Sequence, residues 1–285
     1  MCSPATYSVL AEAEHALGRL DEAAERLPGR HWFVRSTRVR DAVCSAHLSG
    51  LPVGLREAFA ADLVAGQGPP PVDRYGPTRA LAPYLAVPDG VDEPLTPDVP
   101  RLEAIASAHY RREVLRPFRA QEAHRARAAS MRQLVDAGLL RDEVLPLSLA
   151  LEEDTPEYRR QLHRVVETGE VEQWLRFFAE AVRDQALAQV RLIGRTLELI
   201  DEYARRVRRA GTLAEVAVDL AGFPVVNHRA LVDRYEVSPK TATNLTRQMV
   251  ELGMLVQWGG GSTYRRIYVC EDALGLVSQE SPDLW

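Results

Sequence analysis

The sequence predicts a mostly α-helical protein that ends in a small module containing two strands. Over most of the chain, apolar residues recur every three or four positions, the spacing that places them on one face of a helix. Clusters of proline and glycine separate these stretches and mark the ends of helices. Near the C-terminus the pattern changes to two short runs, 254–258 and 264–270, joined by a glycine-rich turn. Such a pair of runs is typical of a β-hairpin.

The composition is that of an ordinary globular protein. Of the 285 residues, 46% are hydrophobic and 26% are charged, and the net charge is -5, so no global field draws the chain onto nucleic acid. The cysteines Cys2, Cys44 and Cys270 lie far apart without metal-ligand spacing, which predicts free thiols. The sequence shows no signal peptide and no apolar run of the ~18 residues that span a bilayer. We therefore expect a cytoplasmic protein without a membrane partner.

Three helices are expected in the N-terminal part of the chain. The first covers residues 5–27, with apolar residues at helical spacing. The second should begin at Ser36 or Thr37, either of which is a good N-cap, and run toward Gly50. A third, short helix should cover residues 55–64.

Residues 66–100 differ in character because prolines and glycines interrupt any long element. We predict a loop here. Apolar side chains within it should anchor it against the core, so it is not a flexible linker. These anchors are Tyr75, Leu81, Tyr84 and Leu85.

Helical patterns resume after residue 100. One helix is expected over residues 102–114 and a second over 119–140. Thr155 should cap the next helix, with Pro156 in its first turn. Residues 171–209 then predict a long amphipathic helix or two abutting ones.

The C-terminal part predicts a helix-turn-helix followed by a wing. A helix over residues 212–222 precedes a second helix that Asn227 caps. Ser238 then provides the N-cap, and Pro239 the first position, of a third helix over 240–252. The two predicted strands follow, which completes the winged pattern.

The third helix of this module carries side chains suited to DNA. Asparagine, glutamine and arginine can read base edges, whereas lysine and threonine suit phosphates. The module is nearly neutral, since residues 212–270 hold six Lys or Arg and five Asp or Glu, so protein contacts or dimerisation remain alternatives. The candidate DNA-binding residues are Lys240, Thr241, Thr243, Asn244, Arg247 and Gln248, with Arg265 and Arg266 in the wing.

Several segments together resemble the Fic-domain family. The stretches 11–28, 41–50, 109–118 and 139–178 are similar to that family in order and spacing. The resemblance covers most of residues 10–272 and implies a Fic-like helical core, followed by the winged helix-turn-helix. It is specific as a set, because no single stretch carries it alone.

The catalytic loop of that family reads H-P-F-x-[DE]-G-N-G-R-x-x-R, and the resemblance implies an adenylyl-transfer site. Its histidine is the general base for a target hydroxyl, its acidic residue holds magnesium, and its glycines and asparagine cradle phosphates. The corresponding segment here is RPFRAQEAHRAR, residues 116–127, in which Pro117, Phe118 and Arg127 match. The departures are Arg116 for the base, Ala120 for the metal ligand, Gln121 and Ala123 for the glycines, Glu122 for the asparagine and His124 for the first arginine.

These replacements remove the chemistry that the resemblance implies. Arg116 stays protonated at physiological pH and cannot accept a proton. Ala120 offers no oxygen ligand for magnesium. Residues 121–128 favour a helix, which would tie up the backbone N–H groups that a glycine-rich loop offers to phosphate, and Glu122 adds negative charge there. We therefore expect no useful adenylyl transfer.

Two further departures agree with this interpretation. The inhibitory helix of the family carries S-x-x-x-E-G, whose glutamate blocks the nucleotide pocket. This sequence has Ser45, Ser49 and Gly50, so a serine stands in the place of the glutamate. An empty site needs no inhibitor, but the same loss also fits a constitutively open site. The β-hairpin flap that aligns the target in the family is replaced by the proline-rich loop.

Three functions remain open. The first is a non-catalytic Fic homologue that acts as a DNA-binding or scaffold regulator, the second a Fic scaffold repurposed as an enzyme on a small anionic substrate, and the third residual transfer of AMP. Only the third needs ATP and magnesium, and we expect no other cofactor, no metal site and a homodimer. The candidate pocket residues are His109, Glu113, Arg116, Glu122, His124 and Arg127.

The sequence thus divides into five predicted regions. They are a Fic N-terminal helical region (1–65), a loop in place of the flap (66–100), a degenerate Fic core (101–210), a winged helix-turn-helix (211–272) and a C-terminal tail (273–285).

Overall fold

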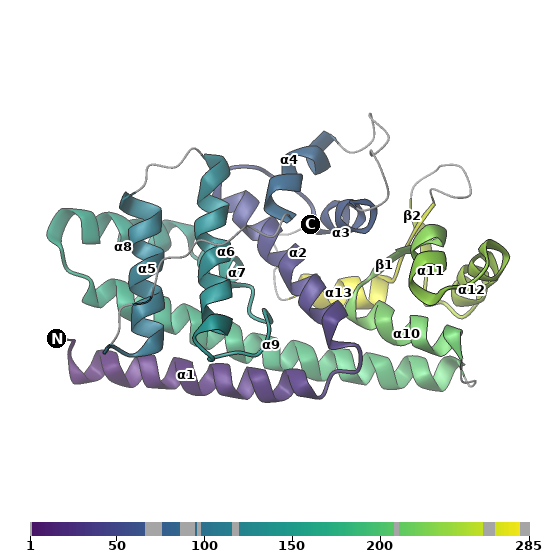
Figure 1. The fold of residues 1–285 in the computed structure, drawn as a ribbon, viewed down its shortest axis with the longest axis horizontal. Coiled ribbons are helices and arrows are strands. Elements are labelled where there is room, and N and C mark those ends of the chain that lie inside the picture. The colour runs from purple at the N-terminus through teal and green to yellow at the C-terminus, as the bar shows by residue number, and fades with distance from the viewer. Residues whose placement is uncertain are drawn as a thin grey trace. The chain divides into compact units, whose positions relative to one another are not determined.

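The computed structural model describes residues 2–65, 76–85, 95, 98–115, 120–207, 211–258 and 266–279 (Figure 1). These residues form a mostly helical fold with a small three-stranded antiparallel sheet near the C-terminus, consistent with a winged helix. The fold class predicted from the sequence is confirmed. The chain divides into two units. Unit 1 consists of residues 1–26, 37–53 and 79–191, and unit 2 of residues 27–36, 54–78 and 192–285.

Unit 1 is built from helices around an aromatic core. Trp174 is fully buried, and its indole N–H donates to the backbone oxygen of Ala106 at 2.9 Å, while its ring stacks on His109. The core thereby ties α9 to α5. The elements of unit 1 are α1 (Pro4–Glu25), most of α2 (Arg30–Leu48), most of α4 (Gly76–Leu85), α5 (Arg101–Leu115), α6 (Ala120–Asp136), α7 (Leu147–Glu152), α8 (Thr155–Thr168) and the first part of α9 (Glu172–Val207).

The start of α2 differs from the prediction. Ser36 and Thr37 were expected to cap this helix, but it begins at Arg30, and both residues lie inside it. Gly29 has a left-handed backbone with φ of 66°, and its carbonyl accepts the first hydrogen bond, from the N–H of Trp32 at 2.9 Å. Helix α2 therefore begins directly after Gly29, because its own sequence contains no glycine or proline that would interrupt it.

The N-cap of α8 is also one residue earlier than predicted. Asp154, not Thr155, caps the helix, and its carboxylate accepts from the N–H of Glu157 at 2.9 Å. The Thr155 hydroxyl instead donates to the carbonyl of Glu152 at 3.0 Å. Aspartate and threonine are both good caps, so the sequence alone did not separate them.

The predicted loop over residues 66–100 contains a helix, α4, so the loop prediction is wrong for Gly76–Leu85. Pro83 lies inside this helix, in its last turn, and Pro77 lies in its first turn, where the missing N–H costs no helical hydrogen bond. Of the predicted anchors, Leu81 is fully buried, as expected. Tyr84 and Leu85 are half-buried. Tyr75 lies outside the described residues.

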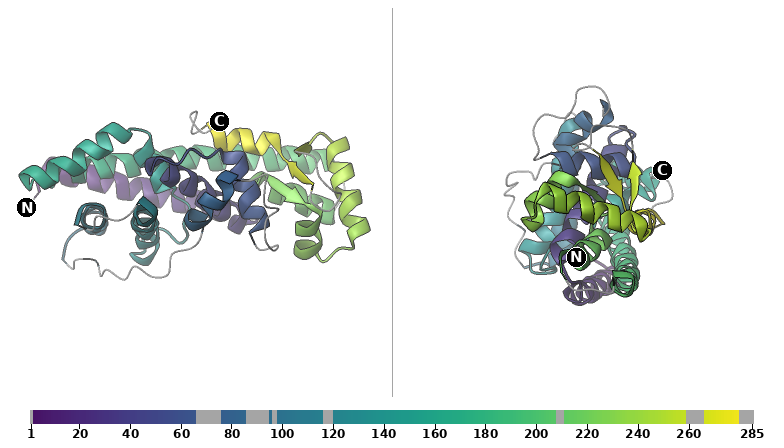
Figure 2. Two further views of the ribbon diagram at one scale, coloured as in Figure 1. Left: turned by 90° about the horizontal axis from the view of Figure 1, so that it is seen from above. Right: turned by 90° about the vertical axis from the view of Figure 1, so that its right-hand side faces the viewer.

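Unit 2 contains the helix-turn-helix and its sheet, seen from two further sides in Figure 2. The strands pair antiparallel in the order β1-β3-β2, with Val269 opposite both Val225 and Val256. The elements of unit 2 are α3 (Leu55–Val64), the end of α9, α10 (Thr212–Gly222), β1 (Val225–Asn227), α11 (His228–Tyr235), α12 (Pro239–Glu251), β2 (Val256–Trp258), β3 (Ile267–Val269) and α13 (Glu271–Gln279).

The predicted caps of the helix-turn-helix are confirmed. The Asn227 side chain accepts from the N–H of Ala230 at 2.7 Å, and the Ser238 hydroxyl accepts from the N–H of Thr241 at 3.1 Å. The sequence analysis missed two elements. Strand β1 has only three residues, too few for a periodic signal. Helix α13 occupies Glu271–Gln279, where mostly a tail was expected.

Unit 2 is assembled from distant parts of the sequence. The guanidinium of Arg234 on α11 lies 3.3 Å from the centre of the Trp32 ring. Arg35 lies 4.7 Å from the ring of Phe223 and donates to Asp62 of α3 at 2.6 Å. Residues 27–36 and α3 therefore form the packing surface on which the C-terminal helices and strands rest.

Cys2, Cys44 and Cys270 are free thiols, as predicted. Within the described segments, no helix combines the length and apolarity that crossing a bilayer requires.

Asp41 of α2 fixes the position of α7 within unit 1. Its buried carboxylate accepts from the backbone N–H of Ser148 at 2.6 Å and from the Ser148 hydroxyl at 3.0 Å. Burial raises the pKa of Asp41 from 3.8 to about 6, against the opposing effect of these two hydrogen bonds. The folded protein therefore binds this proton more tightly than the unfolded chain. Stability from this group is greatest below pH 3.8 and is lost as pH rises through 6.

We predict that Asp41→Asn stabilises the protein at pH 8 but not at pH 4. Asparagine keeps the acceptor for the Ser148 N–H and removes the buried charge. From the pKa shift, the gain in the free energy of unfolding at pH 8 is about 3 kcal/mol. Urea titrations of both proteins at both pH values measure it. An asparagine variant that is equally destabilised at pH 4 and pH 8 would contradict this account.

Candidate functional site

The segment that resembles the Fic loop leads into α6. This helix begins at Ala120, so residues 120–127 are helical, as the sequence predicted. Their backbone N–H groups beyond the first turn are consequently committed to the helix. Arg116 lies outside the described residues, and the side chain of Glu122 is likewise outside them.

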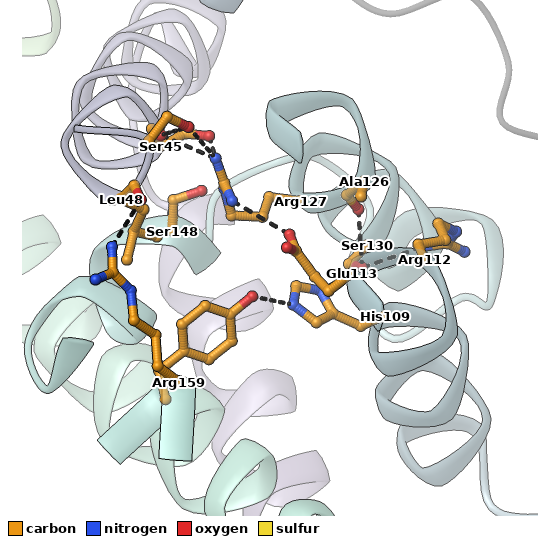
Figure 3. Close-up of polar contacts among 12 residues, drawn as sticks. Ser45, Leu48, His109, Arg112, Glu113, Ala126, Arg127, Ser130, Ser148 and Arg159 are labelled. Atoms are coloured by element: carbon orange, nitrogen blue, oxygen red, sulfur yellow. Dashed lines mark hydrogen bonds and ion pairs between the residues drawn. The ribbon is translucent and has the colours of Figure 1, made fainter. Parts of the chain in front are cut away.

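Arg127 is buried between α2 and α5. Its Nε donates to the Ser45 hydroxyl at 2.8 Å, and its Nη2 donates to the Ser45 carbonyl and to the Ser49 hydroxyl, both at 2.9 Å. Only 3% of the residue is exposed. Figure 3 shows the guanidinium pointing toward Ser45 on one side and Glu113 on the other. The structure thus brings together Arg127 and the two serines that the sequence assigned to the inhibitory motif.

Glu113 supplies the negative charge that Arg127 needs. Its Oε1 lies 3.2 Å from Nη1 of Arg127, and only 11% of its side chain is exposed. Burial raises the pKa of Glu113, whereas the Arg127 charge lowers it. Because a buried guanidinium without a carboxylate is costly, this pair and the two serines hold Arg127 in place.

His109 belongs to a second buried group, which adjoins the first. Its Nδ1 lies 2.9 Å from the Ser130 hydroxyl and its Nε2 lies 3.0 Å from the Tyr158 hydroxyl. The Ser130 hydroxyl also donates to the carbonyl of Ala126 at 3.3 Å. Burial, together with the charges of Arg127 and Arg112, lowers the pKa of His109 to about 3.

His109 is 0% exposed, and both of its ring nitrogens are engaged by protein groups. His124, the other candidate histidine, is also buried, and its ring lies 4.7 Å from that of Tyr84 on α4. These two histidines therefore do not form an acid-base pair with Arg127 at an open surface.

Sequence reasoning missed Tyr158 and Ser130, which complete the His109 group. Tyr158 comes from α8, and its burial raises its pKa well above the ordinary value. Ser130 lies one helical turn beyond Arg127 on α6, a spacing that could have indicated a shared face. Tyr158 had no comparable signal, because it is distant in sequence from both partners.

In the part of the chain that the structure covers, no three His, Cys, Asp or Glu side chains are grouped so that they could hold a metal ion.

The predicted DNA-contacting residues lie on α12 and beside β3. Five of those on α12 are exposed, namely Lys240, Thr241, Thr243, Asn244 and Arg247, and Gln248 is half-exposed. Their outward orientation is as predicted. In the wing, Arg266 is half-buried and Arg265 lies outside the described residues.

We predict that Glu113→Ala destabilises the protein by about 3 kcal/mol, because it leaves the Arg127 charge buried without a carboxylate. Glu167→Ala, which truncates an exposed glutamate of α8, is the matched control and should change stability by less than about 0.5 kcal/mol. Urea unfolding followed by far-UV circular dichroism measures both. Equal effects of the two substitutions would show that the buried pair is unimportant.

The comparison with known families agrees with the N-terminal resemblance. The family model described as Fic/DOC family N-terminal matches residues 7–75. This segment includes Ser45 and Ser49, which hold Arg127, and also Trp32 and Asp62 of unit 2. Residues 116–127 lie outside the match. Residues 7–75 of the chain are therefore similar to the N-terminal domain of the Fic/DOC family.

Proposed function

We propose that this chain is a Fic/DOC-related protein without adenylyl-transfer activity and that it acts as a DNA-binding regulator. The observation that carries the first part is the burial of Arg127, the one charged residue of the family loop that this sequence retains. The observation that carries the second part is the exposed polar face of α12 within a capped helix-turn-helix.

The loss of transfer activity follows from what the site offers. Arg127 is engaged by Ser45, Ser49 and Glu113, so a nucleotide phosphate would have to displace a buried carboxylate and two hydroxyls. General base catalysis contributes about 10²–10⁴-fold on its own, and Arg116 cannot supply it. The contact of Arg127 with Ser45 and Ser49 also supports pairing these two segments with the catalytic loop and inhibitory helix of the family.

A repurposed enzyme that acts on a small anion draws less support. It would need His109, Glu113 and Arg127 at an accessible surface, but the contacts described above commit all three to one another or to the core. The Arg127 charge is neutralised by Glu113, so the described part of this cluster offers little attraction for a second anion.

DNA binding fits the geometry of unit 2. The second helix of a helix-turn-helix enters the major groove and presents the side chains of one face to the base edges. Lys240 is at the start of α12, where its ammonium and the helix N-terminus both favour a phosphate. That the chain forms a homodimer stays a prediction.

We predict that Lys240→Gln weakens binding to every duplex by a similar factor, because it removes a phosphate contact that is independent of sequence. The slope of log K against log salt should become shallower by about 0.9. Gel shifts or fluorescence anisotropy from 50 to 200 mM salt measure the slope.

Arg125→Gln is the control, since this exposed arginine belongs to α6 of unit 1. It should leave affinity and slope unchanged. If the unaltered protein binds no duplex at 50 mM salt, where phosphate contacts are strongest, the DNA-binding proposal is wrong.

A further inference from the structure

Some exposed side chains of α12 already make hydrogen bonds or ion pairs within the protein, and others make none with any described residue. The Thr241 hydroxyl lies 2.9 Å from that of Ser238, which caps the helix. The Thr243 hydroxyl donates to the carbonyl of Pro239 at 3.0 Å. Both threonines are therefore satisfied locally and are poor candidates for reading a base.

Arg247 is paired with Glu251 one turn further along the same helix. Its Nη1 lies 2.7 Å from the carboxylate, and both side chains are more than half exposed, at 61% and 58%. Such a pair changes an equilibrium constant only about twofold, so Arg247 can exchange Glu251 for a phosphate. The carboxylate nevertheless adds negative charge beside Arg247, which opposes close approach of this arginine to the negatively charged groove.

Asn244 and Gln248 remain as the two amide side chains of α12. They are four residues apart, so they are neighbours on one helix face. Asn244 is exposed and Gln248 is half-exposed, and neither side chain makes a hydrogen bond with any described residue. An amide presents one donor and one acceptor side by side, which matches the N6 amino group and N7 of adenine in the major groove.

We propose that Asn244 and Gln248 make α12 a reader of adenine in the major groove of double-stranded DNA. This inference rests on the proposed function and specifies its ligand. It commits to DNA rather than RNA, since the deep, narrow major groove of A-form RNA does not admit a helix. Arg247 and Lys240 then contribute phosphate contacts that hold the helix in register.

The spacing of the two amide side chains along α12 agrees with the spacing of base pairs in DNA. Asn244 is the sixth and Gln248 the tenth residue of α12, so they are separated by about 6 Å along the axis. This distance is close to the rise of two base pairs, at about 3.4 Å each. The selected site should therefore contain two adenines that are one or two base pairs apart.

Selection of bound duplexes from a pool with a randomised centre, at 100 mM salt with the full-length chain, tests the assignment. The unaltered protein should enrich adenine at two nearby positions. Asn244→Ala should lower affinity for the selected site by about 5- to 150-fold and relax one of these positions, with little effect on random duplex. Gln248→Ala should relax the other position.

Two further variants keep the test interpretable. Asn244→Asp has nearly the same shape but offers only acceptors, so the preference at that position should move from adenine to cytosine. Gln173→Ala, which truncates an exposed amide on α9 within unit 1, should leave the selected sequence and the affinity unchanged.

The outcomes separate this inference from the proposed function. If the protein binds no duplex at 50 mM salt, both fail. If it binds duplexes but selects none, selects sites without adenine, or keeps its preference after Asn244→Ala, only the adenine assignment is overturned. Preferential binding of a single-stranded or duplex RNA competitor would overturn the choice of DNA.

Discussion

The buried guanidinium of Arg127 is the constraint on which the account of unit 1 depends. A charge at 3% exposure needs a partner of opposite sign, and α5 supplies it through Glu113 while α2 supplies the hydroxyls of Ser45 and Ser49. Removing one partner of such a group costs about 3–5 kcal/mol, a large share of the stability of a typical domain. The same interaction that holds three helices together thus keeps this arginine engaged with protein groups.

Unit 2 is assembled from segments that are far apart in the sequence. Residues 27–36 and α3, inside the segment that matches the Fic/DOC N-terminal family, supply Trp32, Arg35 and Asp62 to unit 2. Arg234 on α11 stacks on Trp32, so the first helix of the helix-turn-helix rests on this N-terminal segment. The packing of α11 thus depends on a residue that lies far earlier in the sequence.

Much of the fold was predictable because local signals and tertiary packing agree. The caps at Asn227 and Ser238 were predicted from residue type and are observed. The start of α2 was not, because Ser36 is a good cap in isolation but the helix extends back to Arg30. In the site, the resemblance singled out Arg127 and Ser45 separately, and only the structure shows their contact. The contact between Tyr158 and His109 depends on packing of α8 that no local pattern encodes.

Isothermal titration calorimetry of the full chain with ATP and magnesium tests the central claim, that the retained arginine is unavailable and the loop cannot hold a nucleotide. The account predicts no saturable heat with or without magnesium, and no change after Arg127→Ala beyond its effect on stability. Saturable, magnesium-dependent binding that is lost in Arg127→Ala would show that this arginine leaves Glu113 for a phosphate, and would contradict the account.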